Sequence, residues 1–549
     1  MKFMVLRVLL LLISASSFVT ACLLGVKREQ SGSYLISLFA LLLISFIGST
    51  VLYLISERCQ GILKKGLIKK VMLIVFLAGF IIIVGMGFLM HYDEDGRVVW
   101  GTIDSVAYFI QAKIFSTGHI NVPSHELKDF FTTGYCINDG KYYSMYFPGW
   151  PLLLSAGIAL GVPWLINPIL GIVAVLLMYL VGKEIYDRET GLFAAALLLY
   201  SRCFYVLTPT YFSEPSALVV SSLFAYCSVR TLKEPRVIRA LLAGLLLGIL
   251  FLIRPYTAFG VSLPVIGYLV LSVVQRREKA ASSLLILILS FLPMFFMLFL
   301  YNYLQTGSVF LTPFQKYNPS NMLGFGLRSF DIIMNPQPYT LINAVRNTIV
   351  NMAILNLETV PFLFLFLMMV FINRANKWDK LLLATLASII FLHMFYFYRE
   401  PRYYYPGYFA LFLLAARGIS LSGVVLRKYF SDVRIRNLNY FIVLFILVAN
   451  VFIIISPAKP FHDFRSGQKM RDPFSIVKEK KLRNAVVFLR QVPINYVGLY
   501  VQNPLDFNGD VLFVRDLKER NGELMQYYPH RDFYYYDFKA GSGKLTKIN

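Results

Sequence analysis

Long apolar runs constrain this chain more than any other feature of its sequence. Runs of about 20 apolar residues recur along its length, which is enough for an α-helix to cross a hydrocarbon core roughly 30 Å thick. Of its 549 residues, 57% are hydrophobic, which is more than a soluble globular domain carries. The sequence therefore predicts a polytopic α-helical membrane protein.

About 13 transmembrane helices are expected from the lengths of these runs. They are predicted at residues 3–26, 33–56, 71–90, 166–182, 191–212, 215–230, 239–253, 257–275, 281–301, 352–373, 379–398, 405–422 and 439–456. The first run could also pass for a secretory signal. Its apolar core is longer than that of a signal and no small-residue cleavage site follows, so we expect a membrane helix there.

The short loops between the apolar runs are basic. "RCQGILKKGLIKK" holds five basic residues and no acidic one, which is typical of a cytoplasmic loop. Basic loops that face anionic lipid also account for the net charge of +23, so no nucleic-acid partner is predicted. Alternation from this loop places the N-terminus inside and the tail after Ser456 outside.

The chain divides into three predicted regions. Residues 1–70 are expected to form an N-terminal two-helix membrane extension, and residues 71–456 a transmembrane core with a long first outer loop at 91–165. Residues 457–549 are more polar. There "AVVFLR", "YVGLYV", "VLFVRD" and "FYYYDF" alternate like strands, and "LKERNGELMQYY" has the pattern of a helix. This predicts a small extracytoplasmic C-terminal α/β domain.

Asp104 begins an amphipathic stretch, "IDSVAYFIQAKIF", within the first outer loop. Its apolar residues recur at helical spacing, which predicts a helix lying along the membrane surface. An Asp at the start of such a helix can cap the first turn and complement the helix dipole. A capping role and a catalytic role for Asp104 are therefore both open from this stretch alone.

The surroundings of Asp104 resemble the first outer loop of the GT-C glycosyltransferases. Tyr108 follows four residues later, and "STGHINVP", "PGWPLLLSAGIALG" and "YFSEPSALVV" follow in order. This arrangement is similar to the protein O-mannosyltransferases and to the aminoarabinose transferases that modify lipid A. Those proteins often have Glu after the acid and Asp-Pro in the later motif, where this chain has Ser105 and Glu214-Pro215. The resemblance implies a GT-C-like core in residues 71–456 and a polyprenyl-phosphate-linked sugar as donor.

Sugar transfer from a glycosyl phosphodiester sets the roles that these acids would take. The acceptor hydroxyl needs a base within hydrogen-bond reach, and we predict Asp104 as that base, in a displacement that inverts the anomeric centre. Glu214 is predicted to orient the acceptor. Asp104 and Glu214 are also the candidate ligands of a divalent cation, and no other cofactor is predicted. The alternative for Glu214 is that it caps a helix that has Pro215 at its first position.

The leaving phosphate needs cations, and three arginines fall on the same predicted outer side. Arg254, Arg399 and Arg402 are candidates because the planar guanidinium can bind two phosphate oxygens at once. Arginines at helix ends also snorkel to the membrane surface without binding a ligand. Tyr108 and Tyr403 complete the predicted substrate-binding set, although tyrosines also collect at membrane interfaces.

The leading hypothesis is a membrane glycosyltransferase. Its predicted partners are the polyprenyl-phosphate sugar donor, the lipid bilayer, and an acceptor protein, lipid or glycan. Its predicted location is the bacterial inner membrane, with the active site facing outside the cytoplasm. One alternative is a transporter or flippase of lipid-linked saccharides, for which charges near the middle of the bilayer are expected instead. Another is a polymerase or ligase, for which the main loop is expected late in the chain.

Overall fold

The computed structural model describes residues 76–85, 102–329, 335–360, 363–373, 375–426, 439–440, 442–447, 450, 472–490, 500–537 and 543–548. The predicted extension at 1–70, with its helices at 3–26 and 33–56, lies outside the described residues. The predicted helix at 71–90 is described only over residues 76–85, which are helical. The predicted helix at 439–456 is described only in part.

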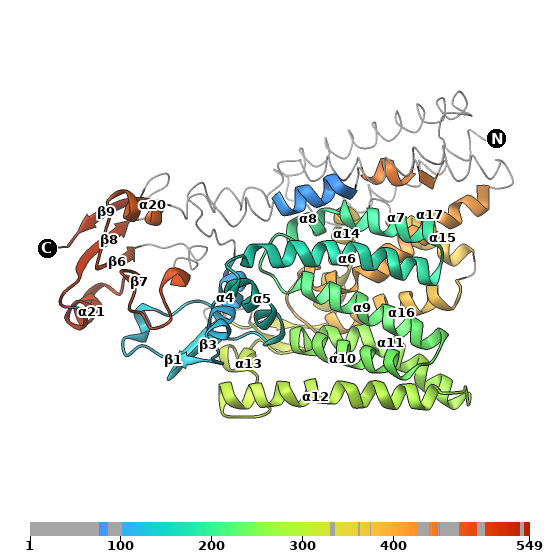
Figure 1. Cartoon of the computed structure of the whole chain (residues 1–549), viewed down its shortest axis with the longest axis horizontal. Helices are drawn as coiled ribbons and strands as arrows, with labels where there is room; N and C mark the ends of the chain where they lie inside the picture. Colours follow the sequence, from blue (N-terminus) through green and yellow to red (C-terminus); the bar gives the residue numbers. More distant parts are fainter. Residues whose placement is uncertain are drawn as a thin grey trace, which may run out of the picture.

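A bundle of helices makes up most of the described residues. Its main members are α6 (Pro163–Ile185), α7 (Arg188–Leu199), α9 (Glu214–Lys233), α10 (Val237–Ile253), α11 (Pro255–Val274), α12 (Ala280–Thr306), α14 (Leu341–Glu358), α16 (Lys377–His393) and α17 (Tyr408–Leu426). The other helices are α4 (Ile103–Ser116), α5 (Gly149–Ala159), α8 (Arg202–Leu207), α13 (Pro313–Tyr317), α15 (Leu363–Ile372), α20 (Asp472–Glu479) and α21 (Asn521–Tyr527), with the 3-10 segments η1 (Lys128–Phe130), η2 (Pro401–Gly407) and η4 (Lys518–Arg520). Figure 1 shows α6, α9, α10, α11 and α12 running side by side.

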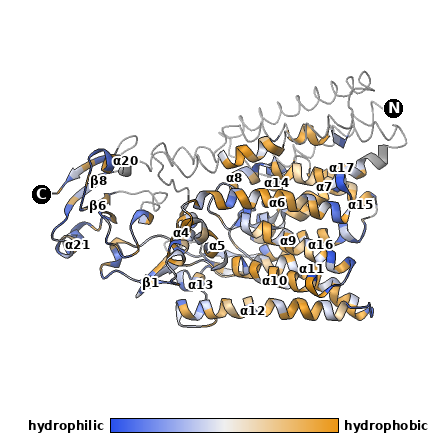
Figure 2. Ribbon diagram, viewed as in Figure 1, coloured by the Kyte–Doolittle hydropathy of each residue, from blue (hydrophilic) through white to orange (hydrophobic). Residues whose placement is uncertain are grey.

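Four of the described helices, α6, α9, α11 and α12, are long and apolar enough to cross a membrane. Figure 2 shows hydrophobic residues along these helices and more hydrophilic residues at the end of the molecule that carries the sheets. The prediction of a polytopic α-helical membrane protein is confirmed. The number of about 13 transmembrane helices stays a prediction, because it rests on run lengths alone.

Two predicted spans are wrong as single helices. The span predicted at 191–212 is broken, since α7 ends at Leu199 and the short α8 follows from Arg202. The Ser201 hydroxyl bonds to the Leu198 carbonyl, and its extended backbone turns the chain. The span predicted at 352–373 is divided between α14, which ends at Glu358, and α15, which begins at Leu363.

The long loop predicted at 91–165 contains a small antiparallel sheet. Its strands β1 (Val122–Pro123), β2 (Cys136–Asp139) and β3 (Lys141–Ser144) have the order β1-β3-β2. Helices α4 and α5 pack against each other, and α4 also packs on β3. A second hairpin, β4 (Gly326–Arg328) with β5 (Gln337–Tyr339), lies in the later loop between α13 and α14. The chain therefore builds ordered structure outside its long helices at two places.

Near the C-terminus lies a four-stranded sheet with the order β7-β6-β8-β9. Its strands are β6 (Ala485–Arg490), β7 (Val511–Arg515), β8 (Asp532–Asp537) and β9 (Lys544–Lys547), and only β9 is antiparallel to its neighbour. The strands predicted in "AVVFLR", "VLFVRD" and "FYYYDF" are thus confirmed. The strand predicted in "YVGLYV" lies mostly outside the described residues, and its described end at Tyr500 and Val501 is helical rather than extended.

Contacts tie the segments between these strands to the loop that contains α4 and η1. The Lys113 ammonium of α4 donates to the carbonyl oxygens of Val501 at 3.2 Å and Asn503 at 2.7 Å. Arg520 pairs with Asp129 of η1 at 2.7 Å. The C-terminal residues therefore hold the end of α4 opposite to the turn that carries Asp104.

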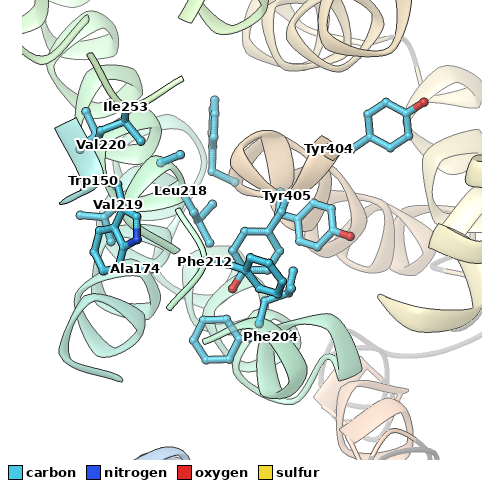
Figure 3. Close-up of a cluster of buried hydrophobic side chains, with 14 of the residues drawn as sticks. Trp150, Ala174, Phe204, Phe212, Leu218, Val219, Val220, Ile253, Tyr404 and Tyr405 are labelled. Carbon is cyan, nitrogen blue, oxygen red and sulfur yellow. The ribbon is translucent and has the colours of Figure 1, made fainter. Parts of the chain in front are cut away.

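Buried packing joins the first outer loop to the membrane helices. Figure 3 shows Trp150 of α5 beside Ala174 of α6 and Val219 of α9. The Trp150 indole donates to the Tyr211 carbonyl at 2.8 Å, so this large side chain is buried with its polar atom satisfied. The loop is therefore positioned by the helix bundle rather than by its own small sheet alone.

Helices α10 and α12 approach closely at Gly244, which gives a test of the packing. A Cβ at Gly244 would lie 2.0 Å from the Ser290 Oγ and 2.2 Å from the Leu287 carbonyl oxygen. We expect Gly244→Ala to lower the free energy of unfolding by about 1–3 kcal/mol, because the helices must separate. Gly267→Ala in α11 is the matched control, since nothing lies within 4 Å of its Cβ position. Equal melting temperatures of the two variants in detergent would contradict this packing.

Candidate active site

Asp104 lies in the first turn of α4 without capping it. The N-cap is Thr102, whose side chain accepts a hydrogen bond from the Ser105 backbone N–H at 3.3 Å. The predicted capping alternative for Asp104 is therefore wrong. Its carboxylate, 20% exposed, instead accepts a hydrogen bond from the Tyr146 hydroxyl and lies 3.6 Å from Arg402 Nη2.

Glu214 is the first residue of α9, and Ser213 precedes it as the N-cap. The prediction that Glu214 caps this helix and that Pro215 is its first residue is therefore wrong, because Ser213 is the cap and Glu214 is the first residue. Its carboxylate is 2% exposed and lies 3.0 Å from Arg254 Nη1 and 3.8 Å from Arg402 Nε. Burial of an ionised carboxylate is costly unless it is paired, and these guanidinium groups supply the opposite charge.

Arg402 bridges the two acids from the 3-10 segment η2. Its Nη2 lies near Asp104 and its Nε near Glu214, while its guanidinium group lies over the Phe212 ring at 4.2 Å from the centroid. Two carboxylates and two guanidinium groups, with formal charges that cancel, thus meet in one cluster. We call Asp104, Glu214, Arg254 and Arg402 the charged cluster.

Tyrosines and one serine contact the charged cluster. Tyr108 stacks on Tyr146, with ring centroids 4.1 Å apart, and its hydroxyl lies 3.1 Å from the Ser213 hydroxyl. Arg254 Nη1 donates to the same serine oxygen at 3.1 Å. Burial, and next the Asp104 charge, raise the pKa of Tyr146, so this phenol stays protonated and donates to Asp104.

Three helix N-termini converge on the charged cluster. Asp104 lies in the first turn of α4, Glu214 begins α9, and Arg254 directly precedes α11. Unpaired backbone N–H groups and the helix dipole give each N-terminus a partial positive charge. Such ends attract anions, and phosphate groups in particular. The arrangement can hold an anion beside two carboxylates.

Most of the predicted site residues come together. Asp104, Glu214, Arg254 and Arg402 form the charged cluster, with Tyr108 and Tyr403 beside it. Arg399 is an exception, because its side chain is exposed and no ion pair joins it to the two acids in the described part of the chain. The chain turns at Glu400 and directs Arg402, rather than Arg399, toward the carboxylates.

Sequence reasoning missed Tyr146 and Ser213. Tyr146 follows β3, which packs on α4, and no spacing in the sequence links it to Asp104. Ser213 lies in the quoted motif "YFSEPSALVV" directly before Glu214, so its place as the N-cap could have been found there.

A metal site is not evident among the described side chains. They contain no group of three or more His, Cys, Asp or Glu residues that could hold an ion. Arg402 lies between Asp104 and Glu214, and together with Arg254 it balances their charge. The divalent cation stays a prediction.

Comparison with known proteins gives a family match over part of the chain. Residues 158–301 match the family model described as dolichyl-phosphate-mannose-protein mannosyltransferase, a stretch that includes Glu214 and Arg254. No match was found among the curated proteins.

Solved structures give the overall likeness. The structure of ArnT from Cupriavidus metallidurans bound to undecaprenyl phosphate aligns with a TM-score of 0.54 at 11% identity, over 85% of this chain and 92% of that one. The oligosaccharyltransferase AglB from Archaeoglobus fulgidus aligns with a TM-score of 0.47 at 14% identity, over 85% and 69% of the two chains. The arabinosyltransferase EmbB from Mycobacterium smegmatis aligns with a TM-score of 0.44 at 13% identity, over 72% and 41%. The chain is therefore an integral membrane protein with the fold of the GT-C glycosyltransferases, and the resemblance to their protein mannosyltransferase and ArnT-like group is confirmed.

Proposed function

We propose that the chain transfers a sugar from a polyprenyl-phosphate-linked donor to an acceptor hydroxyl on the extracytoplasmic side of the membrane. The observation that carries this proposal is the charged cluster at three helix N-termini, which offers a base and a phosphate site within a few ångströms. The structural neighbour ArnT is bound to undecaprenyl phosphate, which supports a lipid phosphate of this class as the donor's carrier.

Asp104 is the proposed general base. As the acceptor oxygen attacks the anomeric carbon, its proton passes to the Asp104 carboxylate, and the bond from that carbon to the phosphate oxygen breaks. Attack from the face opposite the phosphate inverts the anomeric centre. The Tyr146 hydroxyl holds one carboxylate oxygen and Arg402 faces the other, so the base is fixed before the acceptor arrives.

Arg254 and Arg402 are the proposed phosphate ligands. Negative charge gathers on the phosphate as the bond breaks, and fixed guanidinium donors stabilise that charge in the transition state. Each of them already pairs with Glu214, which at 2% exposure is too buried to meet an acceptor. In this proposal Glu214 is a positioning residue for the two arginines, which differs from the acceptor-orienting role expected from sequence.

The proposed orientation of the protein in the membrane can be tested by labelling introduced cysteines. Thr117 is exposed at the end of α4 and Glu278 is exposed between α11 and α12. We expect a cysteine introduced as Thr117→Cys to react with a membrane-impermeant maleimide in intact cells. A cysteine introduced as Glu278→Cys should react only after the membrane is opened, because Glu278 lies in a basic loop that is predicted to be cytoplasmic. The reverse pattern would exclude an outward-facing site.

The proposed activity is tested with the whole protein in vesicles. Labelled polyprenyl phosphate mannose and other polyprenyl phosphate sugars are offered with hydroxyl-bearing protein, lipid and glycan acceptors. Transfer of label from lipid to one acceptor class is the expected result. Movement of the intact labelled lipid across the bilayer, without release of the sugar, would instead favour a flippase. Addition of a lipid-linked sugar to a growing saccharide chain would favour a polymerase or ligase.

A further inference from the structure

The segment between α12 and α14 exposes large apolar side chains. Residues 307–340 contain only three charged residues, which are Lys316, Arg328 and Asp331. Six of the exposed apolar side chains form what we call the apolar loop surface: Val309, Phe310, Leu311, Leu323, Phe325 and Leu327. Phe310 is 81% exposed and Leu327 is 64% exposed. Exposed apolar patches of this kind mark surfaces that contact a membrane or another protein.

The apolar loop surface continues the exposed side of α12. This helix is long and apolar enough to cross a membrane, and only 17% of the 18-residue stretch that qualifies it as a span is buried among the described residues. Phe310 packs edge-on against Phe299 of α12, with ring centroids 5.8 Å apart. At the other end of the surface, Phe325 packs against Phe395, which follows α16, at 5.6 Å. Lipid that covers α12 would therefore also meet this surface.

Side chains at the end of α12 satisfy backbone carbonyl groups in the turn that follows it. The Asn302 amide donates to the Val309 carbonyl oxygen at 3.2 Å. The Thr306 hydroxyl lies 2.9 Å from the Leu311 carbonyl oxygen. In water such carbonyl groups can bond to solvent, whereas in lipid they must find partners within the protein. The turn that presents Phe310 is thus suited to an apolar surrounding.

The guanidinium group of Arg328 does the same for the β4–β5 hairpin. It donates four hydrogen bonds, between 2.7 and 3.2 Å long, to the carbonyl oxygens of Leu323, Gly324, Phe325 and Leu327. The Gly324 N–H donates to the Phe395 carbonyl oxygen at 2.7 Å, and Pro338 of β5 has no N–H to satisfy. Both parts of the apolar loop surface therefore combine exposed apolar side chains with carbonyl groups that do not depend on water.

We infer that the apolar loop surface lies within the bilayer, and that its partner is the acyl-chain region of the leaflet nearest the charged cluster. A protein partner is disfavoured, because the surface offers almost no charge and is continuous with a membrane span. Arg328 is compatible with this position, since a long basic side chain at the edge of a bilayer keeps its charge within reach of headgroups and water. The inference does not depend on the proposed reaction.

This placement also fixes the level of the charged cluster relative to the bilayer. Tyr396 directly follows Phe395 and packs edge-on against Tyr403, with ring centroids 5.3 Å apart. The Arg402 guanidinium group lies over the Tyr403 ring at 5.6 Å from its centroid. The contacts from Phe325 to Arg402 thus pass through only three side chains. A hairpin seated in lipid would hold the charged cluster close to the headgroups.

Quenching of introduced tryptophans tests this inference in the full-length protein. Phe310→Trp and Leu327→Trp are reconstituted in phosphatidylcholine vesicles with or without lipid brominated on its acyl chains, and the emission of the four native tryptophans is subtracted. We expect the added emission to fall by about twofold or more in brominated lipid. Bromines near the headgroups should quench more than bromines at the chain ends, because a surface segment enters the bilayer by only roughly 5–10 Å.

Thr117→Trp is the matched control, since Thr117 is exposed at the end of α4. Its added emission should be quenched by acrylamide in water and little by brominated lipid. All three replaced side chains are exposed, so the melting temperature should stay that of wild type.

Four outcomes would overturn the inference. Quenching of both loop tryptophans by acrylamide alone would place the surface in water. Protection from both quenchers would show that a protein, such as a second copy of this chain, covers it. Equal quenching of all three variants by brominated lipid would show that lipid contact is not specific to this surface. Loss of the lipid quenching when undecaprenyl phosphate is added would make a polyprenyl chain, rather than the leaflet, the occupant.

Discussion

Asp104→Asn is expected to reduce sugar transfer by roughly 10²–10⁴-fold, the range that a general base contributes. The amide has nearly the same shape as the carboxylate and its oxygen can still accept the Tyr146 hydrogen bond, but it cannot take a proton from the acceptor. The loss should therefore fall on the rate of the chemical step. Binding of the donor lipid should change little, because Arg402 retains its other partner, Glu214.

The measurement is the initial rate of label transfer with purified protein, together with donor affinity and melting temperature. Asp139→Asn is the matched control, since Asp139 belongs to the same loop, is 76% exposed and pairs only with surface Lys128 in the part of the chain described. It should transfer sugar as wild type does. A wild-type transfer rate in Asp104→Asn would remove the base assignment, whereas equal losses of transfer and donor binding would make Asp104 a binding residue.

The long helices are the part of the fold that sequence predicts best. Apolar runs between basic loops predict α6, α9, α10, α11 and α12 to within a few residues. The reason is that a segment in lipid must form every backbone hydrogen bond internally, which a continuous helix does. Hydropathy does not show where a predicted helix is interrupted. The breaks after Leu199 and Glu358 lie inside runs that the sequence predicts as single spans, and local backbone turns end the helices there.

The sequence predicts those site residues that lie in a motif and have a side chain suited to the reaction. It misses residues that only the folded chain brings into the site. Asp104 and Arg402 are almost 300 positions apart, and their meeting could be expected only through the resemblance to a known family. The role of Glu214 is an example of what sequence leaves undecided. Its position at the N-terminal end of a predicted helix is correct, but only the structure shows it buried between Arg254 and Arg402. Both Arg399 and Arg402 are candidates from sequence, with Arg402 favoured by the resemblance of "PRYYYP" to a family motif. In the described part of the chain, Arg402 and not Arg399 lies beside the two carboxylates.

The largest effect on stability is expected from Arg254→Leu. Arg254 pairs at 3.0 Å with Glu214, which is 2% exposed, and its removal leaves that carboxylate with only the more distant Arg402. Breaking a buried ion pair by removing one partner typically costs about 3–5 kcal/mol. The melting temperature in detergent should therefore fall markedly, and transfer should be lost. Arg483→Leu, which breaks an exposed pair with Asp510, is the control and should change neither.

A double variant separates the structural role of this pair from its proposed chemical role. Replacing a buried ion pair by two apolar side chains is often neutral for stability, so Arg254→Leu combined with Glu214→Leu should recover most of the melting temperature lost in the single variant. Transfer should remain absent, because a phosphate ligand and the positioning residue for Arg402 are both missing. A double variant as unstable as the single one would show that the ion pair is not what the mutation disturbs. One that regains both stability and transfer would show that Arg254 serves folding alone, and the donor phosphate would then have to depend on Arg402.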